Sequence, residues 1–163
     1  QEYVDRGIAA IEKSLAKLVS KERMTQEDAD AARSRISLSI DRSVCADCDL
    51  VVEAVPEILD LKISIFQELD ALCKPETILA SNTSSISITT IAEATNRPDK
   101  VIGMHFMNPV PIMKLVEIIN GKKTSEQTNA AVIQASEQMG KTALSCNDSP
   151  GFVSNRIFCP MLN

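Results

Sequence analysis

The sequence is poor in aromatic residues and has no long apolar segment. Its 163 residues include no tryptophan, one tyrosine and one histidine. No uninterrupted apolar stretch approaches the roughly 20 residues that cross a bilayer, and the amino terminus lacks the basic and then apolar pattern of a signal peptide. We therefore expect no membrane insertion, no secretion and a cytoplasmic location.

A basic stripe is also missing. The formal net charge is -5, with acidic and basic residues interspersed, whereas nucleic-acid binding needs clustered lysines and arginines. We expect no nucleic-acid partner, so any anionic ligand must be bound by a local group of side chains. A hydrophobic content of 44% is ordinary for one folded domain of this length.

The five cysteines lack the spacing of a disulfide framework or of a complete zinc site. An odd number without an export signal favours reduced thiols. Cys45 and Cys48 form one CxxC pair, but structural zinc needs a second pair of ligands, and neither Cys73 nor Cys146 supplies one at the usual spacing. The sequence predicts no metal site.

The first 40 residues combine two helical patterns with one alternating pattern. Apolar residues recur with helical spacing from residue 1 to about 21, opposite a row of lysines. Thr25 and Asp28 have the spacing of a capping box, which predicts a second helix to about Arg33. Apolar residues then alternate with serines over residues 36–40, as in a half-buried strand.

Strands alternate with helices in the middle of the chain. Short apolar runs predict strands at residues 49–55, 77–81 and 101–106, and helical periodicity predicts helices at about 57–72 and 87–94. This alternation indicates βαβ units and a mostly parallel, Rossmann-like α/β sheet.

The pattern changes after residue 106. Pro109 and Pro111 interrupt the chain, and the connection to a strand at 114–119 is too short for a helical crossover, so that strand is expected to be antiparallel to its predecessor.

We place a domain boundary between residues 147 and 148. The remaining predicted elements are a helix capped by Thr124 and Gln127 that runs to Met139 and ends at Gly140, a strand at 142–146, a linker at 147–151 and a helix at 152–163.

The single histidine, His105, ends one predicted strand, and the next strand contains one carboxylate, Glu117. A neutral imidazole can take a proton near pH 7, and a neighbouring carboxylate can fix its tautomer and favour its charged form. The pair is therefore a candidate acid/base dyad. The alternative is a buried structural histidine, with Glu117 facing solvent on an edge strand.

Polar side chains follow the predicted strands, where open parallel sheets bind ligands. Each has a structural alternative: Ser84 and Ser85 can cap the helix at 87–94, and Lys62 can pair with carboxylates of its own helix. Together they fit the oxidation of a secondary alcohol, which requires removal of the hydroxyl proton and positioning of the oxygen. The full set is Glu57, Lys62, Asn82, Thr83, Ser84, Ser85, His105, Asn108 and Asn155.

Four motifs lie in order along the chain. They are DLVVEAVPE at 49–57, ASNTSS at 80–85, HFMNPVPIMKLVE at 105–117 and SPGFVSNR at 149–156. In sequence and spacing they resemble the L-3-hydroxyacyl-CoA dehydrogenase family, and within it the bacterial 3-hydroxybutyryl-CoA dehydrogenases. The resemblance implies an NAD-dependent oxidoreductase that interconverts 3-hydroxyacyl-CoA, here 3-hydroxybutyryl-CoA, and 3-ketoacyl-CoA in fatty-acid or butyrate metabolism.

The resemblance also implies roles for individual residues. His105 would accept the proton of the 3-hydroxyl group, Glu117 would orient the imidazole and favour its protonated form, and Ser84 and Asn155 would hold the substrate oxygen. The cofactor contacts would be Glu57, Lys62, Ser84 and Asn108, and the coenzyme A contacts would be Ser14, Lys21 and Ser84.

Two features of the resembled family are missing from the 163 residues. No GxGxxG turn, which binds pyrophosphate at a helix amino terminus, occurs in the sequence. The residue that selects NAD or NADP is missing with it, so NAD is expected and NADP stays open. The family's helical domain, which completes the cleft and forms a homodimer, would follow residue 163. We therefore expect a partial NAD-binding domain at 1–147 without its first βα unit, the start of a helical domain at 148–163, and little or no activity of the chain alone.

Other interpretations stay open at this point. The dehydrogenase module of a multifunctional β-oxidation enzyme shares these motifs. A crystallin-like relative, or one that only binds acyl-CoA, would keep the fold without catalysis.

Overall fold

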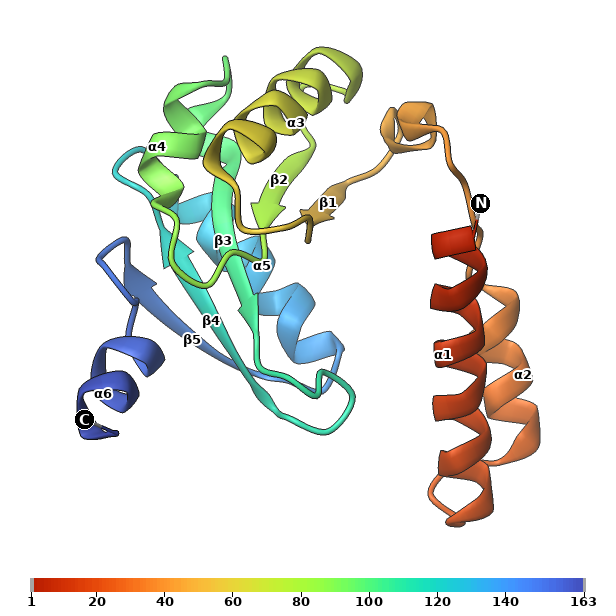
Figure 1. Cartoon of the computed structure of the whole chain (residues 1–163). Helices are drawn as coiled ribbons and strands as arrows, with labels where there is room; N and C mark the ends of the chain where they lie inside the picture. The colour runs from red at the N-terminus through yellow and green to blue at the C-terminus, as the bar shows by residue number, and fades with distance from the viewer. Residues whose placement is uncertain (1, 163) are drawn as a thin grey trace. The chain divides into compact units, whose positions relative to one another are not determined.

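The computed structural model describes residues 2–162. Contacts between residues divide the chain into two compact units, one up to Val44 and the other from Cys45 onward (Figure 1). The boundary predicted between residues 147 and 148 concerns the linker after the last strand and stays a prediction. Among residues 2–162, no helix is both long and apolar enough to cross a membrane.

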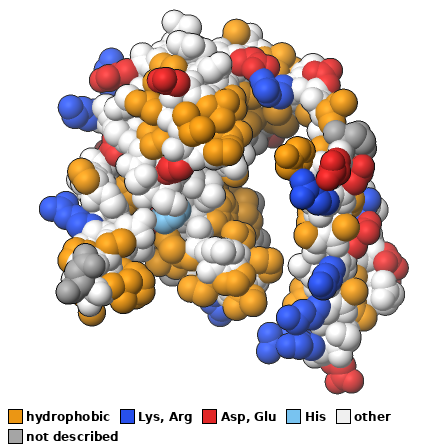
Figure 2. Space-filling model, in the orientation of Figure 1, with side chains coloured by type: hydrophobic (Ala, Val, Ile, Leu, Met, Phe, Trp, Pro, Cys, Tyr) orange, Lys and Arg blue, Asp and Glu red, His pale blue; other side chains and the backbone are white. Residues whose placement is uncertain are grey.

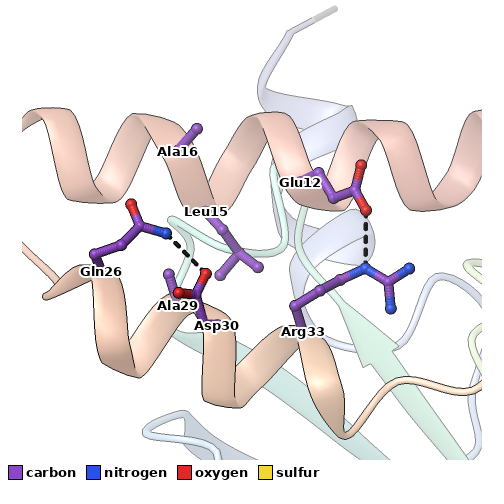
Figure 3. A pocket seen from close by; sticks show the side chains of 7 residues that line it. All are labelled: Glu12, Leu15, Ala16, Gln26, Ala29, Asp30 and Arg33. Carbon is purple, nitrogen blue, oxygen red and sulfur yellow. Dashed lines mark hydrogen bonds and ion pairs between the residues drawn. The ribbon is translucent and has the colours of Figure 1, made fainter.

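The first unit is a pair of helices, α1 (Glu2–Ser20) and α2 (Gln26–Ser34). The predicted cap of α2 is confirmed, because the Thr25 side chain accepts a hydrogen bond from the backbone N–H of Asp28. The first helix was expected from Gln1, which lies outside the described residues. A groove of about 270 Å³ lies between α1 and α2 and is lined in part by small and apolar side chains (Figure 3). Glu12 and Arg33, which also line it, form an ion pair at 2.9 Å.

The strand predicted over residues 36–40 is wrong. These residues have no regular structure, and Leu38 and Ile40 are 45% and 74% exposed. A strand needs a neighbouring strand for its backbone hydrogen bonds, and the described part of this unit contains only helices. The alternating pattern was therefore insufficient by itself.

The second unit is built on a five-stranded sheet in the order β1, β2, β3, β4, β5. The first three strands are parallel, β4 is antiparallel to β3, and β5 is parallel to β4. The predicted mostly parallel α/β fold and its antiparallel strand are both confirmed. The strands are β1 (Leu50–Glu53), β2 (Ile78–Ser81), β3 (Val101–Phe106), β4 (Leu115–Asn120) and β5 (Thr142–Asn147).

Helices cover both faces of this sheet (Figure 1). Adjacent residues of β2 point to opposite sides: Leu79 belongs to the apolar cluster that includes Phe66, and Ala80 belongs to the cluster that includes Val132. Strands buried on both faces read as continuous apolar runs, which is why they could be predicted. The helices are α3 (Leu59–Leu72), α4 (Ile88–Glu93), α5 (Glu126–Gln138) and α6 (Ser154–Met161), with short 3-10 helices η1 (Arg42–Cys45) and η2 (Pro98–Lys100).

The predicted cap of α5 is off by one residue. The cap is Ser125, whose side chain accepts from the backbone N–H of Thr128 at 3.1 Å. Thr124 instead donates its hydroxyl hydrogen to the carbonyl of Val101 at 2.6 Å, which ties the helix to β3. Gly140 ends the helix as predicted, with a φ of 72° that favours glycine.

The last helix is shorter than predicted. It was expected over residues 152–163, but α6 spans Ser154–Met161, and Asn163 lies outside the described residues. Gly151 and Phe152 precede it with φ values of 75° and 52°. This left-handed turn brings the start of α6 to β4.

Candidate active site

His105 and Glu117 are direct cross-strand neighbours. The antiparallel register of β3 and β4 pairs the two residues, so their side chains leave the sheet on the same face. His105 Nδ1 lies 2.8 Å from Glu117 Oε2. The interpretation of Glu117 as a solvent-facing residue on an edge strand is wrong, because the residue is fully buried and β4 lies between β3 and β5.

The second oxygen of Glu117 binds the start of α6. Oε1 accepts backbone N–H groups from Ser154 at 2.7 Å and Val153 at 3.1 Å. Burial raises the pKa of Glu117, but the hydrogen bonds from His105, Ser154 and Val153 outweigh it, so the pKa is lowered. The carboxylate is therefore ionised near neutral pH. Since it can only accept, it places the proton of the neutral imidazole on Nδ1 and leaves Nε2 as the basic nitrogen.

Phe152 completes the surroundings of the imidazole. Its ring meets the His105 ring edge-on, with centroids 5.8 Å apart and an interplanar angle of 62°. The phenyl ring is 2% exposed and joins the apolar cluster of α3 and α4. Sequence reasoning missed this residue. The signal that could have found it is a large aromatic residue directly after a Pro-Gly turn and before a helix.

Ser84 and Asn155 are brought together although they lie 71 positions apart in the sequence. The side-chain amide of Asn155, at the start of α6, donates to the carbonyl oxygen of Ser84 at 3.1 Å. Ser84 follows β2 and is exposed. It does not cap α4, because that cap is Ser87, so the capping alternative for Ser84 and Ser85 is wrong. The unit therefore carries an imidazole paired with a carboxylate, and a serine hydrogen-bonded to an asparagine, from four segments.

A small part of the His105 side chain is exposed to solvent. The residue is 7% exposed, and its pale blue side chain is visible at the surface of the second unit in Figure 2. A general base must be reachable by its substrate, so burial of the ring with this small opening is compatible with proton transfer.

Glu57 lies beside the same segment, just before α3. Its Oε1 accepts the hydroxyl of Thr83 and the backbone N–H groups of Ser84, at 2.8 Å, and Ser85, at 3.1 Å. Burial raises its pKa, but these hydrogen bonds and the charge of Lys62 outweigh that effect and the pKa is lowered. These contacts hold Glu57 before the first turn, so α3 begins at Leu59 and not at about Glu57 as predicted.

The other predicted ligand contacts differ in their surroundings. Asn108 lies after β3 and is exposed. Lys62 is fully buried, and its partners Glu53 and Glu57 both precede α3, so the alternative of a pair within its own helix does not hold for the helix as it stands. Ser14 and Lys21 are exposed residues of the first unit, and the Ser14 hydroxyl donates to the carbonyl of Ala10.

Known proteins share the sequence and the fold of this chain. The family model described as the NAD binding domain of 3-hydroxyacyl-CoA dehydrogenase matches residues 1–149. The chain is 55% identical over its full length to a probable 3-hydroxybutyryl-CoA dehydrogenase of Deinococcus radiodurans and covers 58% of that protein. It is 42% identical to the fatty acid oxidation complex subunit alpha of Psychrobacter arcticus, with 98% of the chain and 22% of that protein covered.

A solved structure gives the same result. The crystal structure of (S)-3-hydroxybutyryl-CoA dehydrogenase from Ralstonia eutropha superposes with a TM-score of 0.96 at 48% identity, over 98% of this chain and 56% of that one. The chain thus spans between a half and two thirds of the length of this structure and of the Deinococcus relative. The match of sequence and fold shows that the chain belongs to the 3-hydroxyacyl-CoA dehydrogenase family.

Proposed function

We propose that the full-length protein carrying this chain is an NAD-dependent dehydrogenase that interconverts 3-hydroxybutyryl-CoA and acetoacetyl-CoA. The observation that carries the proposal is the buried His105 and Glu117 pair at 2.8 Å. Glu117 also binds the backbone of Ser154, and the next residue, Asn155, is hydrogen-bonded to Ser84. Relatives named 3-hydroxybutyryl-CoA dehydrogenase support the substrate.

The residues of this chain would move one proton in the oxidative direction. Nε2 of His105 accepts the proton of the 3-hydroxyl group, while the Glu117 carboxylate holds Nδ1–H and stabilises the imidazolium that forms. Ser84 and Asn155 hold the substrate oxygen as it becomes a carbonyl. A nicotinamide cofactor, when bound, supplies the hydride acceptor for C3. In the reductive direction the imidazolium returns the proton to the oxygen.

The edge formed by the ends of the parallel strands fits such a cofactor. Glu57, Ser84 and Asn108 present a carboxylate, a hydroxyl and an amide after three successive parallel strands, and these groups suit the hydroxyls and carboxamide of a dinucleotide. We assign these three residues to cofactor binding. Coenzyme A contacts at Ser14, Lys21 and Ser84, a helical domain beginning at residue 148, a cytoplasmic location and a homodimer are parts of the same proposal.

The proposal is tested with the full-length protein, acetoacetyl-CoA and NADH. The His105→Gln variant should lower kcat by about 10²- to 10⁴-fold, the usual contribution of general acid/base catalysis, while NADH binding and the thermal unfolding midpoint stay close to wild type. Consumption of NADH is followed by absorbance. A wild-type protein without turnover would overturn the proposed function, and a variant within a few fold of wild type would overturn the role of His105.

A further inference from the structure

Lys62 is fully buried, although lysines are almost never fully buried unless they are paired. It lies in the first turn of α3 with no exposed surface. Its Nζ lies 2.7 Å from Glu53 Oε1, 3.1 Å from the carbonyl oxygen of Val55 and 3.4 Å from Glu57 Oε2. An ammonium group has three N–H donors, and three protein oxygens surround this one. Two of the donors of Lys62 are thus hydrogen-bonded to protein oxygens, and its charge forms an ion pair with Glu57.

Glu53 anchors the inner end of this group. It is the last residue of β1 and is 5% exposed. While Oε1 binds Lys62 and the backbone N–H of Val55, Oε2 accepts the hydroxyl of the fully buried Ser81, the last residue of β2, at 2.7 Å. The ammonium is therefore fixed relative to the ends of two strands.

Glu57 forms the outer end. Its side chain is 38% exposed, in contrast to those of Lys62 at 1% and Glu53 at 2%. One oxygen faces Lys62, and the other accepts the backbone N–H groups of Ser84 and Ser85. A continuous set of contacts thus runs from the buried strand ends through Lys62 and Glu57 to the backbone of Ser84.

We propose that Lys62 is a positioning residue: its ammonium fixes the Glu57 carboxylate, which fixes the backbone of Ser84 where the hydroxyl meets the substrate oxygen. This inference rests on the function proposed above. It assigns Lys62 an action through Glu57, in addition to the cofactor contact that the resemblance implies. Glu53 and Ser81 hold the ammonium in place.

The first test is a double-mutant cycle in the full-length protein with acetoacetyl-CoA and NADH. Lys62→Met keeps the length of the side chain and removes the charge. It should lower kcat by about 10- to 100-fold, as misplacement of a reacting group does. Because Glu57 is also assigned to cofactor binding, the KM for NADH should rise as well, so the fall in kcat is the readout. In the Ser84→Ala background the same substitution should cost less than about twofold, because the hydroxyl that it would misplace is already gone.

The matched control is Lys74→Met. Lys74 follows α3 and pairs at 2.6 Å with the exposed Asp49, which precedes β1, so it joins the opposite ends of the same two elements. An exposed pair contributes little, and kcat should stay within about twofold of wild type. Equal losses for Lys62→Met in both Ser84 backgrounds would overturn the proposal. So would a raised KM for NADH with unchanged kcat, which is the signature of a direct contact.

Hydrogen exchange supplies a readout that does not require turnover. Lys62→Met should accelerate exchange in a peptide that covers residues 82–87, where the amides of Ser84 and Ser85 donate to Glu57, and Lys74→Met should not. Unchanged protection in Lys62→Met overturns the proposal. If Lys62→Met does not fold, Glu53→Gln/Lys62→Met removes both charges together and takes its place. A wild type inactive toward acetoacetyl-CoA would overturn the proposed function, and the exchange experiment would still decide whether Lys62 orders the Ser84 segment.

Discussion

At the scale of single residues, the site depends on side chains in unusual environments. A histidine and a glutamate are buried as a pair, a lysine has no exposed surface, and Phe152 adopts a φ of 52°. Each of these carries a cost, since buried charge and left-handed backbone are both unfavourable for such residues. Their accumulation in one unit supports a functional site, because strained and buried polar groups concentrate at such sites.

Phe152 offers a test of how much the His105 ring depends on packing. Phe152→Leu in the full-length protein should lower kcat about tenfold, because the imidazole loses the ring that restricts its orientation. The KM for acetoacetyl-CoA should change by less than about twofold. Both are measured in steady-state assays at saturating NADH.

The same substitution elsewhere in the core is the control for that prediction. Phe66 belongs to the same apolar cluster as Phe152 and is fully buried. Phe66→Leu should lower stability by about 1 kcal/mol with kcat nearly unchanged. An equal fall in kcat for both variants would show that general loosening of the core, and not the contact with His105, controls the rate.

Residue types alone identified the polar members of this site but not their mutual contacts. His105 and Ser84 were recognised from their places at the ends of apolar runs, and Glu117 as the one carboxylate inside such a run. The distance between His105 and Glu117 depends on a strand register set by the connection between β3 and β4, and no local pattern encodes it. Lys62 was recognised as a polar residue after a strand, but its burial was not predicted, because it depends on the pairing with Glu53, nine positions earlier.

At the scale of elements, one arginine secures the end of α3. Arg97 precedes η2, and its guanidinium donates to the Asp70 carboxylate at 2.6 Å and to the carbonyls of Asp70, Cys73 and Lys74. The last carbonyls of a helix have no partner within the helix. A planar group with five N–H donors can satisfy several of them at once, so Arg97 acts as a cap supplied from a distant part of the chain.

Removal of this cap should destabilise the second unit. We expect Arg97→Ala to lower the free energy of unfolding by about 2–4 kcal/mol, because it leaves buried carbonyls and the carboxylate of Asp70 without their partner. Urea unfolding of the full-length protein at pH 7, followed by circular dichroism, measures the change. Lys74→Met, which breaks an exposed ion pair, should cost less than about 1 kcal/mol. Equal costs would refute the capping role.

The elements themselves were largely predictable, and the errors have physical causes. Buried strands and periodic helices were found because burial on both faces leaves long apolar runs. The false strand at 36–40 followed from alternation without a partner strand, and the misplaced cap of α5 followed from adjacent threonine and serine residues that could each have served. Tertiary contacts, such as the bond from Thr124 to Val101, decided between them.

At the scale of the whole molecule, several partly buried carboxylates link folding to pH. In each of them burial raises the pKa, but hydrogen bonds outweigh burial and leave the folded-state pKa below its ordinary value. The stability that they contribute is therefore complete above the ordinary pKa of about 4 and is lost as pH falls through the lowered folded-state pKa. The residues are Glu57, Asp70, Glu117 and Asp148.

Asp148 is suited to test this linkage because it lies outside the proposed site. Its carboxylate accepts the Ser87 hydroxyl at 2.7 Å and the backbone N–H of Thr89 at 2.9 Å. Asp148→Asn should lower stability by about 1 kcal/mol at pH 7, and the difference from wild type should shrink as pH falls from 5 to 3. Urea midpoints across that range measure it. Glu76→Gln, at an exposed position, controls for the loss of one negative charge. A difference that is constant with pH would contradict the assignment.

The two hydrogen-bonding oxygens of Glu117 have a consequence for how the molecule works as a whole. One holds the His105 imidazole and the other holds the first amides of α6. Two events that share one carboxylate are thermodynamically reciprocal. A position of Glu117 that binds the first amides of α6 also places its other oxygen on the His105 imidazole, so whatever stabilises α6 in its place also favours the aligned imidazole. The docking of α6 and the readiness of the base are thus coupled through a single side chain.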